Sequence, residues 1–323
     1  MKVQKVDFEV VVIGGGAAGL SGALTLARAR RSVLVIDSGK PRNAPASHVH
    51  GYLGREGVAP AELVAVGRAE VAGYGGEFLA GRVVAVEGSV AEGFRVVLEE
   101  GAAAVTARRL LVTTGLVDEL PPVPGVAERW GREVLHCPYC HGWEVRDAPL
   151  GILATGPLAV QQALMWRQWS EDVTLFRHTA PEFGDEEYEQ LAARDIAVVD
   201  GDVVALEVTD DRLSGVSLAG GRVVAVRAVV VPPLFNARGG ILADLGAKTV
   251  DREMAGQVVG RHIPTDPAGA TTVPGVWAAG NVADPTETVI GSAAAGLRAA
   301  AAVNADLIAE DTRQAVEARR GER

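Results

Sequence analysis

Both cysteines of the chain, Cys137 and Cys140, stand in one short motif, HCPYCHGWE, at residues 136–144. Two cysteines separated by two residues can close a small disulfide ring, and a local positive field can lower the pKa of one thiol so that its thiolate attacks. His136 and His141 flank the pair, and either could move the proton that accompanies each thiol step. The motif therefore predicts dithiol–disulfide redox chemistry.

A zinc site and a pair of buried structural cysteines are the alternatives for this motif. With its two histidines the motif offers four metal ligands, but their spacing is too compressed for all four to close a tetrahedron. A secreted domain held by disulfides would scatter more than two cysteines along its length. The redox interpretation is favoured over both alternatives.

The start of the chain has the pattern of a dinucleotide-binding βαβ unit. A continuous apolar strand over 8–13 is followed by the turn GGGAAG at 14–19 and a helix over about 20–30. A second apolar strand, 32–36, then ends at Asp37. We expect these elements to form the core of a nucleotide site.

Each glycine of such a turn, and the acid after the second strand, has a physical purpose. Gly14 permits the tight turn, Gly16 lets the backbone approach a pyrophosphate, and Gly19 lets the helix pack closely on the strand. The N-terminus of the helix then offers free N–H groups and a partial positive charge to the phosphates. Asp37 is placed to bind ribose hydroxyls. By itself this pattern does not choose between FAD and a nicotinamide cofactor.

The composition of the chain argues against some classes of binding partner and indicates where the protein is located. The chain has 323 residues, of which 48% are hydrophobic and 22% charged, and its formal net charge is −10. A surface this acidic repels nucleic acid and anionic membranes. The uncharged run 10–27 follows Asp7 and Glu9 and contains five glycines, so we expect neither a membrane span nor a signal peptide there. A cytoplasmic protein is expected.

Proline-rich segments divide the chain. Three prolines lie within 118–125, and Pro232-Pro233 marks a second linker, with a new αβ pattern starting at Pro149 between them. The predicted fold class is α/β with two dinucleotide-binding, Rossmann-like domains. The first domain is discontinuous, residues 1–117 and 235–323, and residues 118–234 form an inserted domain that carries the cysteines. Trp166 and Trp169 are expected in the core of that insert.

These motifs together resemble the low-molecular-weight thioredoxin reductase family over nearly the whole chain. The shared features are the glycine turn, the inserted domain with its C-x-x-C, and the run TVPGVWAAGN at 272–281. That run is similar to the second FAD motif of the family, with Asn281 in place of an aspartate. His141 likewise replaces the aspartate that follows the second cysteine in the family.

One branch of that family is a closer match. The Cys-x-x-Cys-His-Gly-x-Glu form is similar to the dithiol oxidases that close the disulfides of gliotoxin and holomycin. The loop Pro41–Asn43 and the segment His48–Leu53 also resemble that branch. The resemblance implies oxidation of a small-molecule dithiol, of the dithiolopyrrolone or epidithio type, with O2 as acceptor and H2O2 as product.

The resemblance also implies roles for individual residues. Cys140 would lie nearer the flavin and form the charge-transfer thiolate, and Cys137 would meet the substrate. His141 would act as the general acid and base, assisted by His136 or His50. A homodimer with noncovalent FAD is implied, with cofactor contacts from Gly14, Gly16, Ala18, Gly19, Asp37, Ser38, Arg42, Asn43, His50, Thr114, Gly115, Gly280, Asn281 and Val289.

Binding of NADP(H) is doubtful on the sequence of the insert. Its glycine turn contains only Gly156, and Pro157 removes a backbone N–H from the phosphate cradle. Arg177 and His178 offer positive charge, but the acidic run 185–187 opposes a phosphate. A divergent nicotinamide site built on Arg177 and His178 is the alternative.

Two other functions stay open for the chain. One is a thioredoxin reductase fed by NADPH or ferredoxin, with thioredoxin as partner. The other is a redox-sensing flavoprotein that binds a partner in one disulfide state. Which dithiol is used, and whether the insert rotates, depend on how the loops and domains meet.

Overall fold

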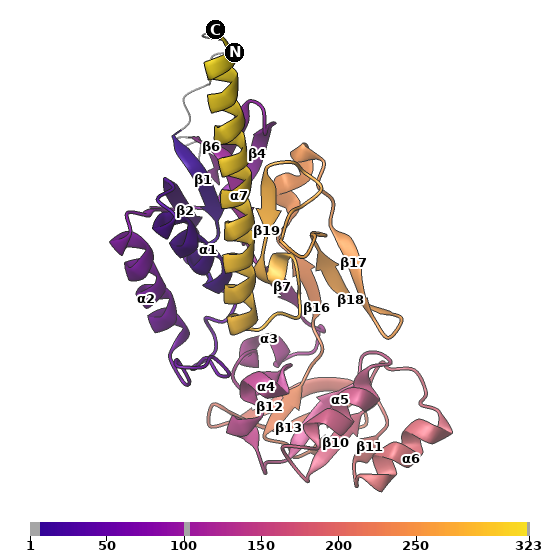
Figure 1. Cartoon of the computed structure of the whole chain (residues 1–323). Helices are drawn as coiled ribbons and strands as arrows, with labels where there is room; N and C mark the ends of the chain where they lie inside the picture. Colours follow the sequence, from indigo (N-terminus) through magenta and orange to yellow (C-terminus); the bar gives the residue numbers. More distant parts are fainter. Residues whose placement is uncertain (1–6, 100–103, 322–323) are drawn as a thin grey trace.

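The first of the two large sheets combines segments from both ends of the chain (Figure 1); it is parallel over β3, β2, β1, β6 and β19 and antiparallel at β5 and β4. A computed structural model describes residues 7–99 and 104–321. The sheet order is β3-β2-β1-β6-β5-β4, with β19 paired to β6. Its strands are β1 (Phe8–Ile13), β2 (Val33–Asp37), β3 (Glu77–Ala80), β4 (Val83–Ser89), β5 (Gly93–Leu98), β6 (Val105–Val112) and β19 (Val276–Ala278).

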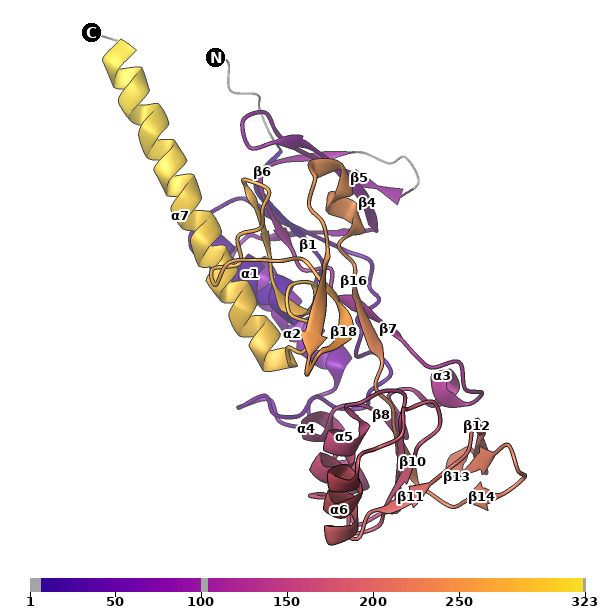
Figure 2. The same ribbon diagram turned by 90° about the vertical axis from the view of Figure 1, so that its right-hand side faces the viewer.

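Residues Val10–Ile13 of β1 are buried on both faces of the sheet, which explains their unbroken run of apolar side chains. Val10 and Val12 face the helices, while Val11 and Ile13 face the opposite cluster. The helices α1 (Ala17–Arg28) and α7 (Val289–Gly321) run side by side over the first face (Figures 1 and 2). They touch closely, since a Cβ on Gly296 would lie 2.0 Å from the Ala18 carbonyl oxygen.

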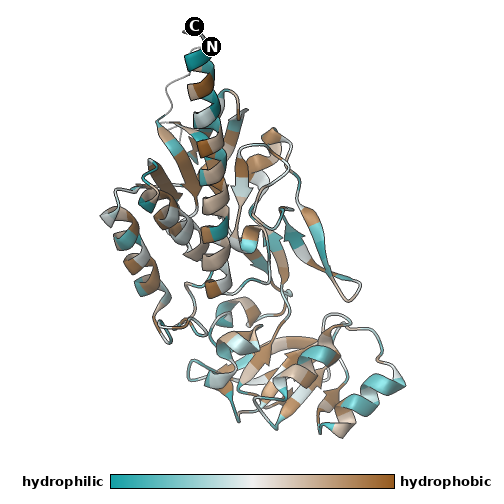
Figure 3. Cartoon of the chain, viewed as in Figure 1, coloured by the Kyte–Doolittle hydropathy of each residue, from teal (hydrophilic) through white to brown (hydrophobic). Residues whose placement is uncertain are grey.

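The second sheet lies within the inserted segment, and all its strand pairs are parallel, in the order β11-β10-β9-β15-β8. Trp166 is fully buried beneath it, as expected for a core residue. Figure 3 shows these strands largely in brown and α6 largely in teal. The strands are β8 (Val134–Leu135), β9 (Leu150–Leu153), β10 (Val173–Phe176), β11 (Ala197–Val199) and β15 (Ala228–Val230).

The remaining helices, the 3-10 turns and a small antiparallel sheet complete the two parts of the chain. The helices are α2 (Pro60–Gly73), α3 (Val126–Arg129), α4 (Pro138–His141), α5 (Ala159–Trp166), α6 (Asp185–Ala193) and the 3-10 turns η2 (Trp143–Val145), η3 (Gly240–Leu245) and η4 (Gly280–Val282). The small sheet consists of β12 (Val203–Thr209), β13 (Arg212–Leu218) and β14 (Val223–Val224).

The connections between the two sheets are more ordered than the sequence predicted. β7 (Leu116–Glu119) pairs antiparallel with β16 (Leu234–Ala237), so part of the expected proline linker is a strand. β16 continues into a hairpin of β17 (Val250–Met254) and β18 (Gln257–His262), which the sequence did not indicate. Main-chain pairing therefore ties the insert to the rest of the chain at this ribbon.

The predicted α/β class is confirmed, with one mixed sheet and one all-parallel sheet. The domain boundaries, 1–117 with 235–323 and 118–234, stay a prediction. Within residues 7–99 and 104–321, no helix has both the length and the apolar character needed to cross a bilayer.

Candidate active site

A disulfide between Cys137 and Cys140 occupies the start of α4, with a Cα–Cα distance of 5.3 Å. Cys137 caps the helix and Pro138 takes its first position, where the missing N–H costs nothing. The Cys137 carbonyl accepts hydrogen bonds from the N–H groups of Cys140 and His141, both at 3.2 Å. The motif thus folds into a short turn that holds both sulfur atoms at one end of a helix.

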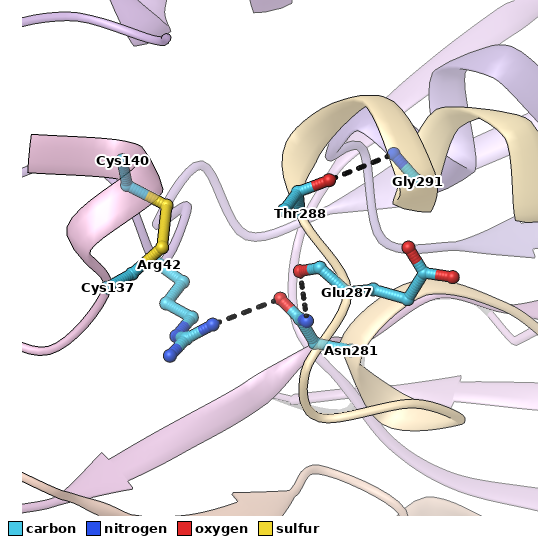
Figure 4. The surroundings of a disulfide bond; sticks show 7 residues. All are labelled: Arg42, Cys137, Cys140, Asn281, Glu287, Thr288 and Gly291. Carbon is cyan, nitrogen blue, oxygen red and sulfur yellow. Dashed lines mark hydrogen bonds between the residues drawn. A yellow bond between two sulfur atoms is a disulfide. The ribbon is translucent and has the colours of Figure 1, made fainter. Parts of the chain in front are cut away.

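The disulfide faces residues from the other part of the chain. Figure 4 draws Arg42, Asn281 and Thr288 around it, from the loop after β2 and from the turn that leads into α7. The Asn281 amide nitrogen donates to the Glu287 carbonyl at 2.9 Å, and its oxygen accepts from Arg42 Nη1 at 3.3 Å. Two residues predicted to contact FAD, Arg42 and Asn281, are therefore brought together beside the cysteines.

Arg42 also ties its loop to the connecting ribbon. Its guanidinium donates two hydrogen bonds to Asp118 of β7, at 2.8 and 2.6 Å, in a bidentate pair. The same guanidinium lies 5.3 Å above the ring of Phe235, which is opposite Asp118 in the β7–β16 pairing. Arg42 is thereby held in one orientation between the loop, the ribbon and Asn281.

The glycine turn after β1 fits the pyrophosphate of FAD. Gly14 has φ +111°, and a Cβ there would lie 2.3 Å from the Thr113 carbonyl oxygen. A Cβ on Gly19 would lie 1.9 Å from the Gly14 carbonyl oxygen, whereas one on Gly16 would meet no atom within 4 Å. Asp37 accepts hydrogen bonds from the N–H groups of Gly15 and Gly39, which orients its carboxylate at the end of β2.

The other predicted FAD contacts are at the same edge of the sheet. β1, β2, β6 and β19 are mutually parallel through their pairings, so their carboxyl ends coincide, and ligands bind at such an edge. Their assignment as FAD contacts stays a prediction, and they fit one elongated cofactor. At strand ends lie Gly14, Gly16, Asp37, Ser38, Thr114, Gly115, Gly280 and Asn281; Ala18 and Gly19 are in α1, Arg42, Asn43 and His50 in the following loop, and Val289 begins α7.

Two histidines of the cysteine motif are in apolar surroundings. Burial lowers the pKa of His141, and neither of its buried ring nitrogens has a hydrogen-bond partner among the described residues. Burial, reinforced by the Arg42 charge, lowers the pKa of His136 to about 4. The His136 ring stacks on Trp130 at 5.5 Å and meets the edge of Phe235 at 5.7 Å. Both histidines are therefore neutral at pH 7.

His50 joins the loop after β2 to the cysteine motif. Its Nδ1 lies 2.6 Å from Glu56 and its Nε2 lies 3.3 Å from Glu144, the last residue of that motif. The hydrogen bond from His50 is the largest cause that lowers the pKa of Glu56. Sequence reasoning placed His50 near the site but missed both carboxylates. The position of Glu144 within the motif was the one available signal for it.

Aromatic side chains flank the disulfide. Tyr139, between the cysteines, is 72% exposed, and Trp143 is 66% exposed. Tyr139 meets the edge of Trp169 at 5.6 Å, and a Cβ on Gly142 would lie 2.8 Å from Trp169 Nε1. Trp169 was expected in the core with Trp166, but it is only half-buried and supports the turn that carries the cysteines.

A glutamine side chain lies close to the second glycine turn, which follows β9. A Cβ on Gly156 would lie 2.3 Å from the side-chain nitrogen of Gln257, at the tip of the β17–β18 hairpin. The hairpin thus covers the turn where a pyrophosphate would enter.

Arg177 and His178, which the sequence offered for binding a phosphate, have other partners. Arg177 pairs with Asp200 at 2.6 Å and Glu182 at 2.9 Å. His178 Nδ1 accepts the Val203 N–H at 3.1 Å, and burial lowers the pKa of this histidine. The adjoining hollow of about 490 Å³ is lined by His178, Thr155 and the linker prolines, with Glu119 as its one carboxylate and no Arg or Lys among its described lining.

Comparison with known proteins identifies the family. The pyridine nucleotide-disulphide oxidoreductase family matches residues 8–300. The thioredoxin reductase sirT of Leptosphaeria maculans is 30% identical over 319 residues, which cover 94% of this chain and 95% of that protein. The thioredoxin reductase tcpT of Claviceps purpurea is 39% identical over 153 residues, covering 46% of this chain and 47% of that protein. The chain thus spans about half the length of that relative.

Solved structures agree with the fold. The crystal structure of HlmI superposes with a TM-score of 0.88 at 51% identity, covering 96% of both chains. An oxidoreductase from Agrobacterium tumefaciens gives a TM-score of 0.87 at 36% identity, covering 93% of this chain and 98% of that one. The chain therefore belongs to the pyridine nucleotide-disulphide oxidoreductase family and is similar to proteins named thioredoxin reductase.

Proposed function

We propose that the protein is an FAD-dependent dithiol oxidase, which oxidises a small-molecule dithiol to its disulfide with O2 as acceptor and H2O2 as product. One observation carries the proposal. The Cys137–Cys140 disulfide faces the predicted FAD edge, while the insert's own nucleotide turn is covered by Gln257. Electrons can then enter through the cysteines, but a nicotinamide has no suitable site from which to deliver them.

The reaction divides between the cysteines and the cofactor. FAD, when bound, accepts two electrons from the reduced cysteine pair and delivers them to O2. A substrate thiolate attacks Cys137, the disulfide opens, and Cys140 leaves as a thiolate. His141 is neutral and its ring nitrogens have no hydrogen-bond partner among the described residues, so it is free to accept the proton of the substrate thiol. The second substrate thiol then displaces Cys137 and closes the substrate disulfide.

The surroundings of the disulfide favour a small, weakly charged substrate. Tyr139 and Trp143 present exposed rings on either side of Cys140 in the sequence, and aromatic faces bind planar or sulfur-containing heterocycles well. A dithiolopyrrolone or epidithio precursor has this chemistry. We further propose that the enzyme is cytoplasmic and that it acts as a homodimer. Sedimentation of the purified holoenzyme tests the homodimer.

Anaerobic titration of the flavin absorbance tests the proposed function. The holoenzyme is titrated separately with NADPH, with dithiothreitol and with 1,2-benzenedimethanethiol, an aromatic dithiol that closes a six-membered cyclic disulfide. We expect the dithiols to bleach the flavin, the aromatic one at lower concentration, and air to restore the colour with formation of H2O2. Rapid bleaching by NADPH would instead support a thioredoxin reductase. Slow reoxidation with a protein bound in one redox state would support a redox sensor.

A further inference from the structure

We propose that Asn281 is a positioning residue that aims the guanidinium of Arg42 at the cysteine turn. There the positive charge stabilises the thiolate that Cys140 carries once the disulfide opens. The inference rests on the proposed dithiol oxidation. The family resemblance implied only a contact with FAD for Asn281 and Arg42, so an action of this pair on the cysteines is a further function.

The side-chain amide of Asn281 lies between carbonyl groups on one side and a cation on the other. Its nitrogen is within hydrogen-bond distance of the carbonyl oxygens of Asp284, Pro285 and Glu287, at 3.2, 3.3 and 2.9 Å. Its oxygen accepts from Arg42 Nη1 at 3.3 Å. Carbonyl groups only accept and a guanidinium only donates, so the partners on the two sides fix the orientation of the amide.

An aspartate, which the family resemblance implies at this position, would not make the same contacts. A carboxylate has no N–H to donate, so one of its oxygens would face three carbonyl oxygens. Its charge would also lie against Arg42. The neutral amide of Asn281 therefore matches the turn before α7 and leaves the charge of Arg42 in place.

The other side of the Arg42 guanidinium is held as firmly. Its Nε and Nη2 donate to the two carboxylate oxygens of Asp118, at 2.8 and 2.6 Å. Asp118 is its only ion-pair partner among the described residues, so the Nη1 edge that faces Asn281 has no carboxylate against it. Arg42 is thus fixed at both edges, and only one of those edges is neutralised.

The cysteine motif lies within reach of that charge. Figure 4 draws Arg42 beside the disulfide. The guanidinium lies 5.3 Å above the ring of Phe235, and the ring of His136 meets the edge of the same phenyl group at 5.7 Å. Burial is the main cause that lowers the pKa of His136, and the Arg42 charge lowers it by more than the Asp118 charge raises it. The residue that precedes Cys137 therefore experiences a net positive field from this ion pair.

Other ionisable groups surround the cysteine turn. They are Tyr139, His136 and His141 of the motif, Glu144 of η2, His50 of the loop after β2, Asp118 of β7 and Glu287 of the turn before α7. Arg146, just after η2, stacks on the Trp143 ring at 4.2 Å and is directed to that side chain. None of the groups in the list is a permanent cation, so loss of the Arg42 charge should be visible in the titration of Cys140.

The exchange step shows where the charge acts. A substrate thiol gives its proton to His141 and its sulfur bonds to Cys137, while the Cys137–Cys140 bond breaks. The electron pair of that bond stays on Cys140 as a thiolate. A nearby positive charge favours the ionised form of a thiol, and a thiol of lower pKa leaves a disulfide faster.

Titration of Cys140 in a Cys137→Ser background tests the inference, because this protein has a single thiol. The rate at which iodoacetamide alkylates the holoenzyme is measured across pH, and the midpoint of the curve gives the pKa of Cys140. We expect Arg42→Gln and Asn281→Asp each to raise this pKa by about one, the lower end of the effect of a neighbouring charge. Arg42→Lys keeps the charge and should stay nearer the unsubstituted background.

Two further comparisons separate positioning from charge alone. Asn281→Ala adds no charge but releases Arg42, so it should raise the pKa of Cys140, and it should add nothing once Arg42→Gln is present. Asn304→Asp is the matched control and should leave the pKa unchanged. Asn304 also accepts an arginine hydrogen bond, from Arg31 Nε at 2.8 Å, but it lies about 20 Å further along α7.

A rate measurement links the titration to the reaction. With both cysteines present, Asn281→Asp should slow anaerobic bleaching of the flavin by dithiothreitol about threefold, since the rate of thiol exchange changes by roughly half a decade for a pKa change of one. Flavin content should stay at the wild-type level, because the family resemblance implies an aspartate in the same FAD motif.

The outcomes separate the inference from the proposed function. If dithiothreitol does not bleach the wild-type flavin, the oxidase proposal fails, while the titration still decides whether Asn281 aims a charge at Cys140. If the flavin bleaches and the pKa of Cys140 is the same in every variant, the oxidase stands and the positioning is wrong. If Asn281→Ala has the same effect with and without Arg42, or if the Asn281 variants lose FAD at an unmoved pKa, Asn281 does not act through Arg42 and the inference is overturned.

Discussion

Two glycine turns in this chain connect a buried parallel strand to the helix after it, and they differ in what lies over them. Above the first turn, a Cβ on Gly16 would meet no atom within 4 Å. Above the second, a Cβ on Gly156 would meet the side chain of Gln257. Each turn follows a strand that pairs in parallel with a neighbour on either side. The two strands are therefore placed alike, but among the described residues a side chain lies over the second turn and not over Gly16 of the first.

This difference separates what stabilises the fold from what binds a nucleotide. Burial of strands such as β1 and β9 needs only apolar side chains on both faces. Nucleotide binding also needs open space, backbone donors and unpaired positive charge at the turn. The insert keeps the first set of properties, while Pro157 and the ion pairs of Arg177 remove parts of the second. A sheet of this type can therefore persist as a carrier for the cysteine motif.

The largest expected effect comes from replacing either cysteine, because the proposed mechanism makes the cysteine pair the only entry for electrons. Cys137→Ser or Cys140→Ser should lower dithiol-dependent H2O2 formation at least about 10³-fold, since either change removes a group that forms a bond in the reaction. Flavin content and bleaching by dithionite should stay at wild-type levels, because neither cysteine is in the first glycine turn. Full turnover in either variant would refute the assigned roles.

The next prediction compares the two turns by the same substitution. Gly19→Ala places its Cβ 1.9 Å from a backbone carbonyl, which cannot move without shifting β1. Overpacking of this kind costs about 1–3 kcal/mol, so we expect FAD binding to weaken about 10–100-fold. Gly156→Ala meets a flexible glutamine side chain instead and should retain wild-type flavin content. Fluorescence titration of the apoproteins with FAD measures both, and equal losses would contradict the comparison.

The sequence predicted the parts of the site that are local in the chain. The C-x-x-C motif, the turn at Gly14–Gly19 and the acid at Asp37 each depend on neighbours a few residues away, and the structure has them in place. The parallel strands of the two sheets followed from apolar runs in the same way. Such features are set by backbone geometry and burial, which short patterns encode.

The missed features all depend on contacts between distant segments. Gln257 reaches Gly156 only because the β17–β18 hairpin extends along β16 toward the insert. His50 lies in the loop after β2, and it contacts Glu144, which lies far along the chain in the insert. The expected linker at Asp118 became a strand because β16 supplies a pairing partner far along the chain. No periodicity within either segment indicates such a pairing, so it needed the tertiary structure.

Opening the covered turn sharpens the comparison with a smaller expected effect. Gln257→Ala removes the side chain over Gly156 but leaves Pro157 and the paired Arg177 unchanged. We therefore expect millimolar NADPH to bleach the flavin of this variant little faster than that of the wild type. Stopped-flow absorbance without oxygen measures the rate, and Gln168→Ala, in the same insert, is a control of the same residue type. Fast bleaching in Gln257→Ala alone would mean that the hairpin is the main barrier to the nucleotide.

The smallest expected effect concerns two histidines, His136 of the cysteine motif and His178 near the second glycine turn. Burial lowers the pKa of His136 to about 4, below its ordinary value of 6.5, so the unfolded chain binds more protons between these pH values. The free energy of unfolding should then fall as the pH drops from about 6.5 to 4, by up to about 1.4 kcal/mol per pH unit from this group.

Two variants test which histidine causes this pH dependence of the free energy of unfolding. His136→Phe keeps the ring against Trp130 but cannot take a proton, so its urea-unfolding free energy should depend less steeply on pH than that of the wild type. His178→Asn keeps an acceptor for the Val203 N–H and should flatten the curve less, because His178 is less deeply buried. If His136→Phe keeps the wild-type slope, the acid sensitivity arises elsewhere. If His178→Asn removes more of it, His178 rather than His136 is the main acid-sensitive group of the two.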